Sequence, residues 1–182
     1  MTSPGPTADS VRLAWPAEAP AIAELQRRVW DAALPPGVAA TVLSEVSAAE
    51  MAQAWEQAIS RPPQARCRVL VAVQEGRVVG LATTVPAQDP DADEAVDGEI
   101  QELVVDPPAR HRGHGSRLLH ACADTLRADG FRTARWWVGT EDDALRRFLV
   151  EAGWAPDGGT REIGTDDEAV RLKQVRLHTD LG

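Results

Sequence analysis

Hydrophobic and polar positions along the first half of the chain alternate in patterns typical of short strands and amphipathic helices. A short strand is predicted over 11–15, and apolar residues at helical spacing predict helices over 16–34 and 47–60. The run 67–86 is rich in β-branched residues and is interrupted at Glu75-Gly76, which predicts a β-hairpin. The first half therefore combines helices with antiparallel strands.

The ends of the two helices carry recognisable signals. Ser47 and Glu50 have the spacing of a capping box at the start of the second helix. The run Pro35-Pro36-Gly37 is predicted to stop the first helix. No helix is predicted between this stop and Ser47.

The second half of the chain predicts strands and helices in turn. In chain order we expect a strand from Glu99, a helix to Leu126, a strand over 131–139, a helix over 142–154, a turn at 157–159, and strands near 161–163 and over 169–178. The strand–helix–strand unit requires a parallel crossover within an otherwise antiparallel sheet. The pattern thus predicts an α/β fold with a mixed, mostly antiparallel sheet.

The length and composition of the chain limit the classes of protein to which it can belong. A chain of 182 residues fits one domain, which we place over 11–182 after a disordered N-terminal lead over 1–10. No apolar run approaches the ~18 residues of a membrane span, and the lead lacks the features of a secretory signal. We therefore predict a cytoplasmic protein that does not bind membranes. Cys67 and Cys122 are predicted to be free thiols.

The net charge of −9 argues against a nucleic-acid-binding protein, because phosphate-binding surfaces need clustered Lys and Arg. Positive charge is instead concentrated where the strand from Glu99 meets the following helix. A helix N-terminus holds anions through free backbone N–H groups and the helix dipole, provided that no side chain blocks the approach. Gly113 and Gly115 remove such side chains, while Arg110 and Arg112 add charge. This joint is predicted to bind a diphosphate.

The segment VVDPPARHRGHGSRLL resembles motif A of the GNAT superfamily of acetyl-CoA-dependent N-acetyltransferases. The signature [Q/R]-x-x-G-x-[G/A] is met by Arg110, Gly113 and Gly115, and the order of predicted elements agrees over nearly the whole chain. The resemblance implies a sheet of about six to seven strands flanked by about four helices, with a splayed central strand pair. It also implies acetyl-CoA as the acetyl donor and a primary amine of a small molecule or peptide as the acceptor.

The resemblance implies positions for the cofactor as well. Backbone amides around the helix start would hold the pyrophosphate, and the strand before it would pair with the pantetheine arm. The residues implied to bind acetyl-CoA are Leu103, Val104, Val105, Arg110, His111, Arg112, Gly113, His114, Gly115 and Ser116.

Two glutamates are candidates for the general base that deprotonates the acceptor amine, because relatives place catalytic carboxylates near both positions. Glu99 and Glu102 are three residues apart and would face opposite sides of a regular strand, so at most one should line the pocket. We favour Glu102, because it directly precedes the segment assigned to the pantetheine. The alternative for each glutamate is an ordinary strand residue that faces solvent and has no catalytic role.

The sequence departs from the family pattern at the expected general acid. Relatives often carry a Tyr that protonates the departing thiolate; Leu149 occupies that place here, and the chain contains no Tyr. The acid is thus unassigned, and solvent can supply the proton, since a thiol has a pKa of about 8.5. An alternative function is a non-catalytic acyl-CoA-binding module.

The residues are less consistent with a metal site. His111, His114 and His120 lack a Cys or carboxylate to complete a zinc site. The acidic run from Asp89 lacks the Gly and the final Glu of a calcium loop, so no metal is predicted. The run is instead predicted to be a flexible acidic loop, whose negative charge would attract a cationic acceptor. The last strand, with Val170, Leu172, Val175 and Leu177, either completes the sheet or extends it across the axis of a homodimer.

Overall fold

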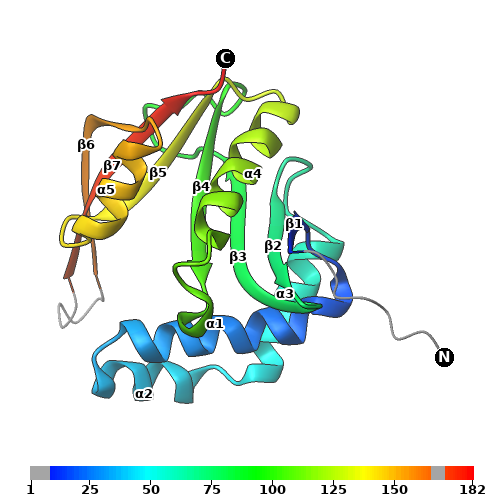
Figure 1. Cartoon of the computed structure of the whole chain (residues 1–182). Helices are drawn as coiled ribbons and strands as arrows, with labels where there is room; N and C mark the ends of the chain where they lie inside the picture. Colours follow the sequence, from blue (N-terminus) through cyan, green and yellow to red (C-terminus); the bar gives the residue numbers. More distant parts are fainter. Residues whose placement is uncertain (1–8, 165–170) are drawn as a thin grey trace. The chain divides into compact units, whose positions relative to one another are not determined.

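The computed structural model describes residues 9–164 and 171–182 (Figure 1). Most of the lead predicted over 1–10 lies outside these residues, as does Val170. The helices are α1 (Ala19–Ala33), α2 (Pro36–Glu45), α3 (Ala48–Ser60), α4 (His114–Ala128) and α5 (Asp143–Glu151), with short 3₁₀ turns at Pro16–Glu18 and Pro107–Ala109. The strands are β1 (Ser10–Leu13), β2 (Arg68–Gln74), β3 (Arg77–Pro86), β4 (Asp97–Val105), β5 (Thr133–Gly139), β6 (Ala155–Gly164) and β7 (Arg171–Asp180).

The strand order is β1-β2-β3-β4-β5-β7-β6, which confirms the predicted mixed sheet. β4 and β5 run parallel, whereas the β1–β2, β2–β3, β5–β7 and β6–β7 pairs are antiparallel. The parallel ladder joins Asp97–Ile100 to Thr133–Trp136 and stops there, while β4 runs on to Val105. This end of the ladder agrees with the predicted splayed pair. β7 lies between β5 and β6, so the last strand completes the sheet.

The described chain divides into two compact units, and β4 and α4 contribute to both. Unit 1 comprises the residues up to Thr84 together with Glu102–Asp124. Unit 2 comprises Val85–Gln101 and the residues from Thr125 onward. Each unit is described by itself below.

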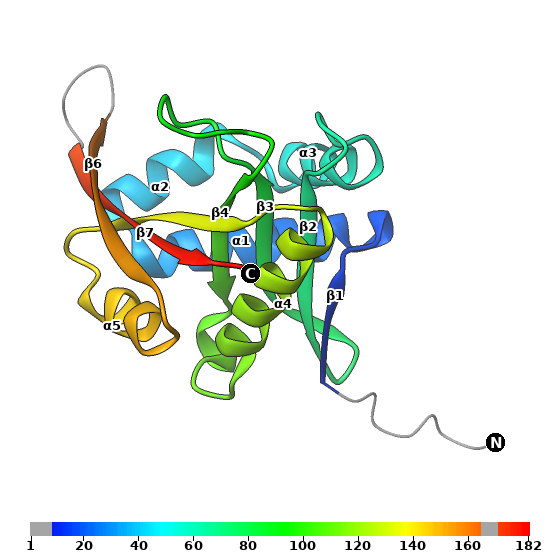
Figure 2. The same cartoon turned by 90° about the horizontal axis from the view of Figure 1, so that it is seen from above.

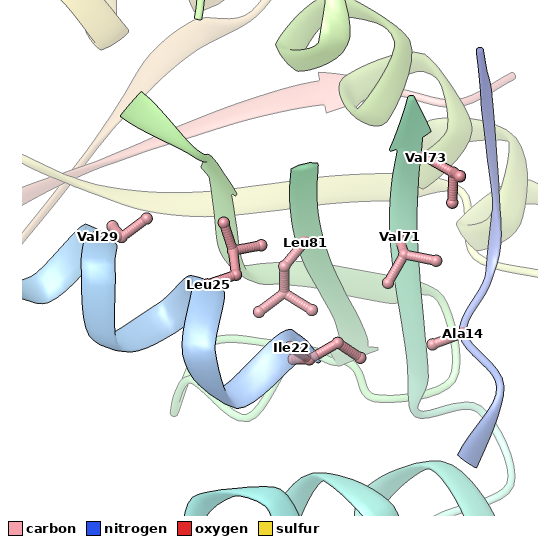
Figure 3. Close-up of a cluster of buried hydrophobic side chains, with 7 residues drawn as sticks. All are labelled: Ala14, Ile22, Leu25, Val29, Val71, Val73 and Leu81. Atoms are coloured by element: carbon pink, nitrogen blue, oxygen red, sulfur yellow. The ribbon is translucent and has the colours of Figure 1, made fainter. Parts of the chain in front are cut away.

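The core of unit 1 is a cluster of aliphatic side chains between α1 and the strands β2 and β3 (Figure 3). It consists of Ala14, Ile22, Leu25, Val29, Val71, Val73 and Leu81. The members from α1 recur every three or four residues and those from β2 every second residue, as the helical and strand periods require. At the start of α3 the side-chain oxygen of Ser47 accepts from the Glu50 backbone N–H, and the Glu50 carboxylate accepts from that of Ser47. The predicted capping box is confirmed.

Two local predictions were wrong. Pro35-Pro36-Gly37 does end α1, but Pro36 also starts α2, which the sequence pattern did not predict. Proline is suited to the first turn of a helix because its φ is already helical and no N–H is needed there. The turn expected at 157–159 is instead an irregularity within β6, where the register with β7 shifts between Pro156 and Thr160.

Unit 2 has a sheet with one apolar and one polar face. Trp136, Val138 and Leu177 are buried on one face, where α5 lies against β6 and β7 (Figure 2). Trp136 packs edge-on against Trp154, with 6.4 Å between ring centroids. The other face carries charged residues, because side chains alternate along each strand.

Gly98 in unit 2 permits close packing against α4. A Cβ at this position would lie 2.5 Å from Leu126 Cδ2 and 3.1 Å from the Phe131 ring. We therefore expect Gly98→Ala to lower the free energy of unfolding by about 1–3 kcal/mol through overpacking. Gly139→Ala is the matched control, since a Cβ there meets no atom within 4 Å. Urea denaturation of both variants tests this, and equal stabilities would contradict it.

Both cysteines are free thiols, as predicted. Cys122 is buried on α4, and burial raises the pKa of its thiol to about 12, which leaves it unreactive. Among the described residues, no helix has the length and apolar character needed to cross a membrane.

Candidate functional site

The joint between β4 and α4 is an exposed turn in unit 1. After the 3₁₀ turn Pro107–Ala109, the residues from Arg110 to Gly113 are all exposed, and α4 begins at His114. Two of them, His111 and Gly113, have left-handed backbone with φ of 62° and 81°. This conformation favours glycine at position 113 and allows the chain to turn sharply into the helix.

The first turn of α4 is open to an approaching anion. The Arg117 backbone N–H donates to the Gly113 carbonyl over 3.1 Å, so the three N–H groups before it have no helical acceptor. A Cβ at Gly113 would meet no atom within 4 Å, and one at Gly115 only Val105 Cγ2 at 3.9 Å. These glycines therefore keep the helix start uncovered rather than making room for internal packing.

Arginines brace the turn and give it positive charge. Arg117 donates to the Arg112 carbonyl over 3.2 Å, and Arg110 Nε donates to the Val105 carbonyl over 3.3 Å. Asp9 is 3.6 Å from the Arg117 guanidinium. The positive charges add to the dipole field at the helix start, which favours a bound anion.

His114 differs from the other residues of the turn because its side chain is fully buried. Its Nδ1 lies 3.0 Å from an Arg117 nitrogen that can only donate, so Nδ1 accepts and the proton resides on Nε2. Burial lowers the pKa of His114, and the positive charge of Arg117 lowers it further. The imidazole is therefore neutral, and the backbone N–H is what His114 offers to an anion.

The end of β4 leads directly into this turn. Leu103, Val104 and Val105 are half-buried, and Val104 packs against the core of unit 1. The Asp106 N–H donates to the Val79 carbonyl, and the Asp106 carboxylate pairs with Arg28 of α1 at 2.8 Å. The corner between strand and turn is thereby fixed to both β3 and α1.

Glu102 is held by a chain of hydrogen bonds from two helices. Gln26 Nε2 of α1 lies 3.2 Å from each carboxylate oxygen, and Gln26 Oε1 accepts from the Trp55 indole of α3 over 2.9 Å. The indole fixes which end of the Gln26 amide faces Glu102, because an indole N–H can only donate. Burial raises the pKa of Glu102, and the bond from Gln26 opposes that rise.

Glu99, the other predicted base, lies in unit 2 and has a different environment. Its side chain is 9% exposed, and it has neither a hydrogen bond nor an ion pair among the described residues. Burial raises its pKa, and the negative charge of Asp89 adds to the rise; Arg161, Arg135 and Arg176 oppose it. The structure thus places the two glutamates in separate units, and among the described residues only Glu102 has a hydrogen-bond partner.

The raised pKa of Glu99 predicts a pH-dependent stability. Above the ordinary glutamate pKa of about 4.3 the unfolded chain gives up its proton first, so ionising Glu99 lowers the free energy of unfolding as pH rises. Glu99→Gln should be more stable than the parent protein at pH 8, and the difference should vanish at pH 4. Denaturant unfolding at both pH values measures this; a constant difference would contradict it.

The sequence pattern did not point to Gln26, Trp55 or Arg117. One feature of the sequence could have identified Gln26. It lies among Ile22, Leu25 and Val29 on the apolar face of α1, which is buried. A polar residue at such a position needs a hydrogen-bond partner. Its partner is 76 positions away in the chain, and no local pattern identifies it.

Known proteins resemble the chain over its whole length in fold. An N-acetyltransferase from Staphylococcus aureus Mu50 superposes with a TM-score of 0.74 at 19% identity, covering 97% of this chain and 100% of that one. YncA from Salmonella typhimurium, solved with its cofactor acetyl-CoA, gives 0.72 at 20% identity over 97% and 95% of the two chains. These likenesses show the fold.

Comparison of the sequence with known proteins identifies the family, which similarity of fold alone does not. Over 85 residues the chain is 34% identical to the mycothiol acetyltransferase of Kineococcus radiotolerans, which covers 47% of this chain and 26% of that protein. The chain thus matches about a quarter of that relative's length. Residues 22–154, which include Gln26, Glu102 and the whole turn before α4, match the acetyltransferase (GNAT) family. The chain therefore belongs to the acetyltransferase (GNAT) family.

Proposed function

We propose that this protein is an N-acetyltransferase that transfers acetyl from acetyl-CoA to a primary amine within a ternary complex. The observation that carries the proposal is the open start of α4, where free N–H groups and the charges of Arg110 and Arg112 face solvent. The similarity to YncA, which was solved with acetyl-CoA, supports the choice of donor.

The proposed cofactor contacts follow from this geometry. Amides of His111 to Ser116 hold the pyrophosphate, with the positive charges of Arg110 and Arg112 beside it. Leu103, Val104 and Val105, which lie past the end of the β4–β5 ladder, offer backbone groups to the amides of the pantetheine arm. The Val105 carbonyl accepts from Arg110 over a long 3.3 Å bond that a ligand amide can replace.

The proposed chemistry needs one base. The amine nitrogen forms a bond to the thioester carbonyl carbon, the carbon–sulfur bond breaks, and the amine proton passes to a carboxylate. Glu102 is the proposed base, because Gln26 holds it in place and its half-buried carboxylate has a raised pKa. Glu99 is the other candidate.

The departing thiolate takes its proton from solvent in this proposal. Leu149, at the place of the family tyrosine, is completely buried and has no proton to give. We expect kcat/KM to rise with pH through the ionisations of the base and the acceptor amine. No alkaline fall should follow, because the chain has no tyrosine to lose a phenol proton. A pH–rate profile tests this, and a steep fall near pH 10 would contradict it.

Titration with acetyl-CoA tests the proposed function directly. Saturable binding at tens of micromolar or below is expected, and its absence would refute both the enzyme and the alternative, an acyl-CoA-binding module. Release of free thiol with a panel of primary amines then separates the two, since the module binds without turnover. A cytoplasmic location and a homodimer stay predictions, and sedimentation at micromolar concentration tests the second.

A further inference from the structure

The polar face of the sheet in unit 2 gathers side chains from four strands. Glu99 of β4 is the register partner of Arg135 on β5, and Trp137 follows two residues later on the same face. Arg176 of β7 is paired with Trp137, and Arg161 of β6 with Gln174, which lies two residues from Arg176. These side chains therefore point to the same side of the sheet.

A pocket of about 380 Å³ lies on this face. Its lining includes Asp89 and Asp91 from the β3–β4 connection, Trp137, Arg161 and Arg176. The volume suits a small molecule rather than a macromolecular segment. Glu99 is not among the lining residues, but it lies on the same face of the sheet, beside Arg135, which is 3.2 Å from the lining residue Asp91.

Hydrogen bonds and ion pairs link the side chains at the floor of the pocket. The Trp137 indole donates to the Asp89 carboxylate over 3.1 Å, and Asp89 also pairs with Arg176 at 3.1 Å. Arg176 is 7% exposed and binds Asp91 and Asp157 at 2.6 and 2.7 Å. Arg135 is likewise paired with Asp97 at 2.8 Å. The charges of these two arginines are therefore already met by carboxylates.

Arg161 is the exception among the arginines of this face. Its guanidinium stacks on the Trp137 ring, 4.3 Å from the ring centroid, and its Nε donates to the neutral Gln174 side chain over 2.7 Å. Within the described residues it has no carboxylate partner. The planar guanidinium thus keeps donors that suit a carboxylate of a ligand.

Glu99 is the exception among the acids. Asp89, Asp91 and Asp97 are each paired with an arginine, whereas the buried Glu99 carboxylate has no hydrogen bond among the described residues. A buried carboxylate without a partner is costly, and a ligand ammonium would remove that cost. This face of the sheet therefore carries, among the described residues, one carboxylate without a hydrogen bond and one guanidinium without a carboxylate partner.

We propose that this pocket binds a zwitterionic ligand, a primary amine that also carries a carboxylate, with the ammonium on Glu99 and the carboxylate on Arg161. The body of the ligand lies on the Trp137 ring. The inference goes beyond the proposed function, since Glu102 and the α4 turn belong to unit 1 whereas this pocket belongs to unit 2. The ligand class is that of amino acids or compounds with an amino-acid end.

Ligand binding without acetyl-CoA tests the inference apart from catalysis. The probes are 4-aminobutyrate and L-2-aminobutyrate as zwitterions, butylamine as the amine alone, and butyrate as the acid alone. Ligand-observed NMR titrations give the affinities. We expect at least one zwitterion to bind about tenfold or more tightly than butylamine and butyrate, the effect of one charge-assisted contact.

Two variants test whether Arg161 binds the ligand carboxylate and Glu99 binds the ligand ammonium. Arg161→Gln should reduce zwitterion affinity to that of butylamine and leave butylamine unchanged, whereas Glu99→Gln should reduce it to that of butyrate. Arg147→Gln is the matched control, because Arg147 is exposed on α5, against the opposite face of the sheet. Since Arg161 is also exposed, its variant keeps the test valid if Glu99→Gln fails to fold.

Three outcomes would overturn the inference. They are butylamine binding as tightly as both zwitterions, zwitterion binding that Arg161→Gln leaves unchanged, and absence of binding by all four probes. None of these results bears on acetyl-CoA binding at the α4 turn or on turnover with other amines, so the proposed function is tested separately.

Discussion

Gly115→Asp is expected to abolish acetyl-CoA binding while the protein still unfolds cooperatively. The proposed diphosphate site needs an uncovered first turn of α4, and a carboxylate at position 115 would lie against the phosphates. The fold tolerates the change, because a Cβ at Gly115 has only an ordinary contact with Val105 Cγ2 at 3.9 Å. Calorimetric titration with acetyl-CoA and thermal unfolding of the same sample measure both quantities.

Two controls separate charge from local structure. Gly37→Asp adds the same charge to unit 1 at a place where a Cβ meets no atom within 4 Å, and it should leave binding unchanged. Gly115→Ala should retain most of the affinity, since it adds no charge. Gly113→Asp should also prevent binding, but its φ of 81° adds about 1–2 kcal/mol of backbone strain. Gly115→Asp that binds like the parent would refute the site.

Glu102→Gln is expected to lower kcat by about 10²-fold or more with little change in acetyl-CoA affinity. A glutamine keeps the size of the side chain and can still accept a hydrogen bond from Gln26, but it does not take a proton at neutral pH. Steady-state kinetics of thiol release, together with an acetyl-CoA titration, measure the two effects. Glu24→Gln, an exposed change on α1, is the matched control.

The same experiment decides between the two glutamates. An unchanged kcat for Glu102→Gln with a large loss for Glu99→Gln would make Glu99 the base. Unchanged kcat for both would indicate a base relayed through solvent. A Trp55→Phe variant tests whether Gln26 positions Glu102, because loss of the indole N–H frees the Gln26 amide to rotate. Its pH–rate profile should shift if Gln26 positions Glu102, whereas a purely structural role would leave the profile in place.

Local signals identified the parts of the fold that depend on neighbours in the chain. The capping box at Ser47, the hairpin at Glu75-Gly76 and the glycines before α4 each act within a few residues, so the sequence pattern was sufficient to place them. Gly76 and Glu75 both have left-handed φ, as a tight hairpin turn of this kind requires. The mixed sheet followed from the order of these elements.

Other features depend on partners that a local pattern does not contain. Pro36 was a stop signal for α1 and a start signal for α2, and the two uses look the same in sequence. Gln26 meets Glu102 across 76 positions, and Arg176 meets Asp91 across 85. The acidic run from Asp89 therefore read as a flexible loop, although its carboxylates are paired with arginines of β5 and β7.

The long separation between Asp91 and Arg176 sets an order of events during synthesis on the ribosome. Asp91 emerges 44 positions before Arg135 and 85 positions before Arg176, so the nascent segment carries its negative charge first without either arginine and then without Arg176. Translation at about 5–20 residues per second makes this delay several seconds. Unit 1 is complete in sequence at Asp124, before either arginine exists. The polar face of unit 2, with its pocket, thus acquires its partners after unit 1 is complete in sequence, first from Arg135 of β5 and later from Arg176 of β7.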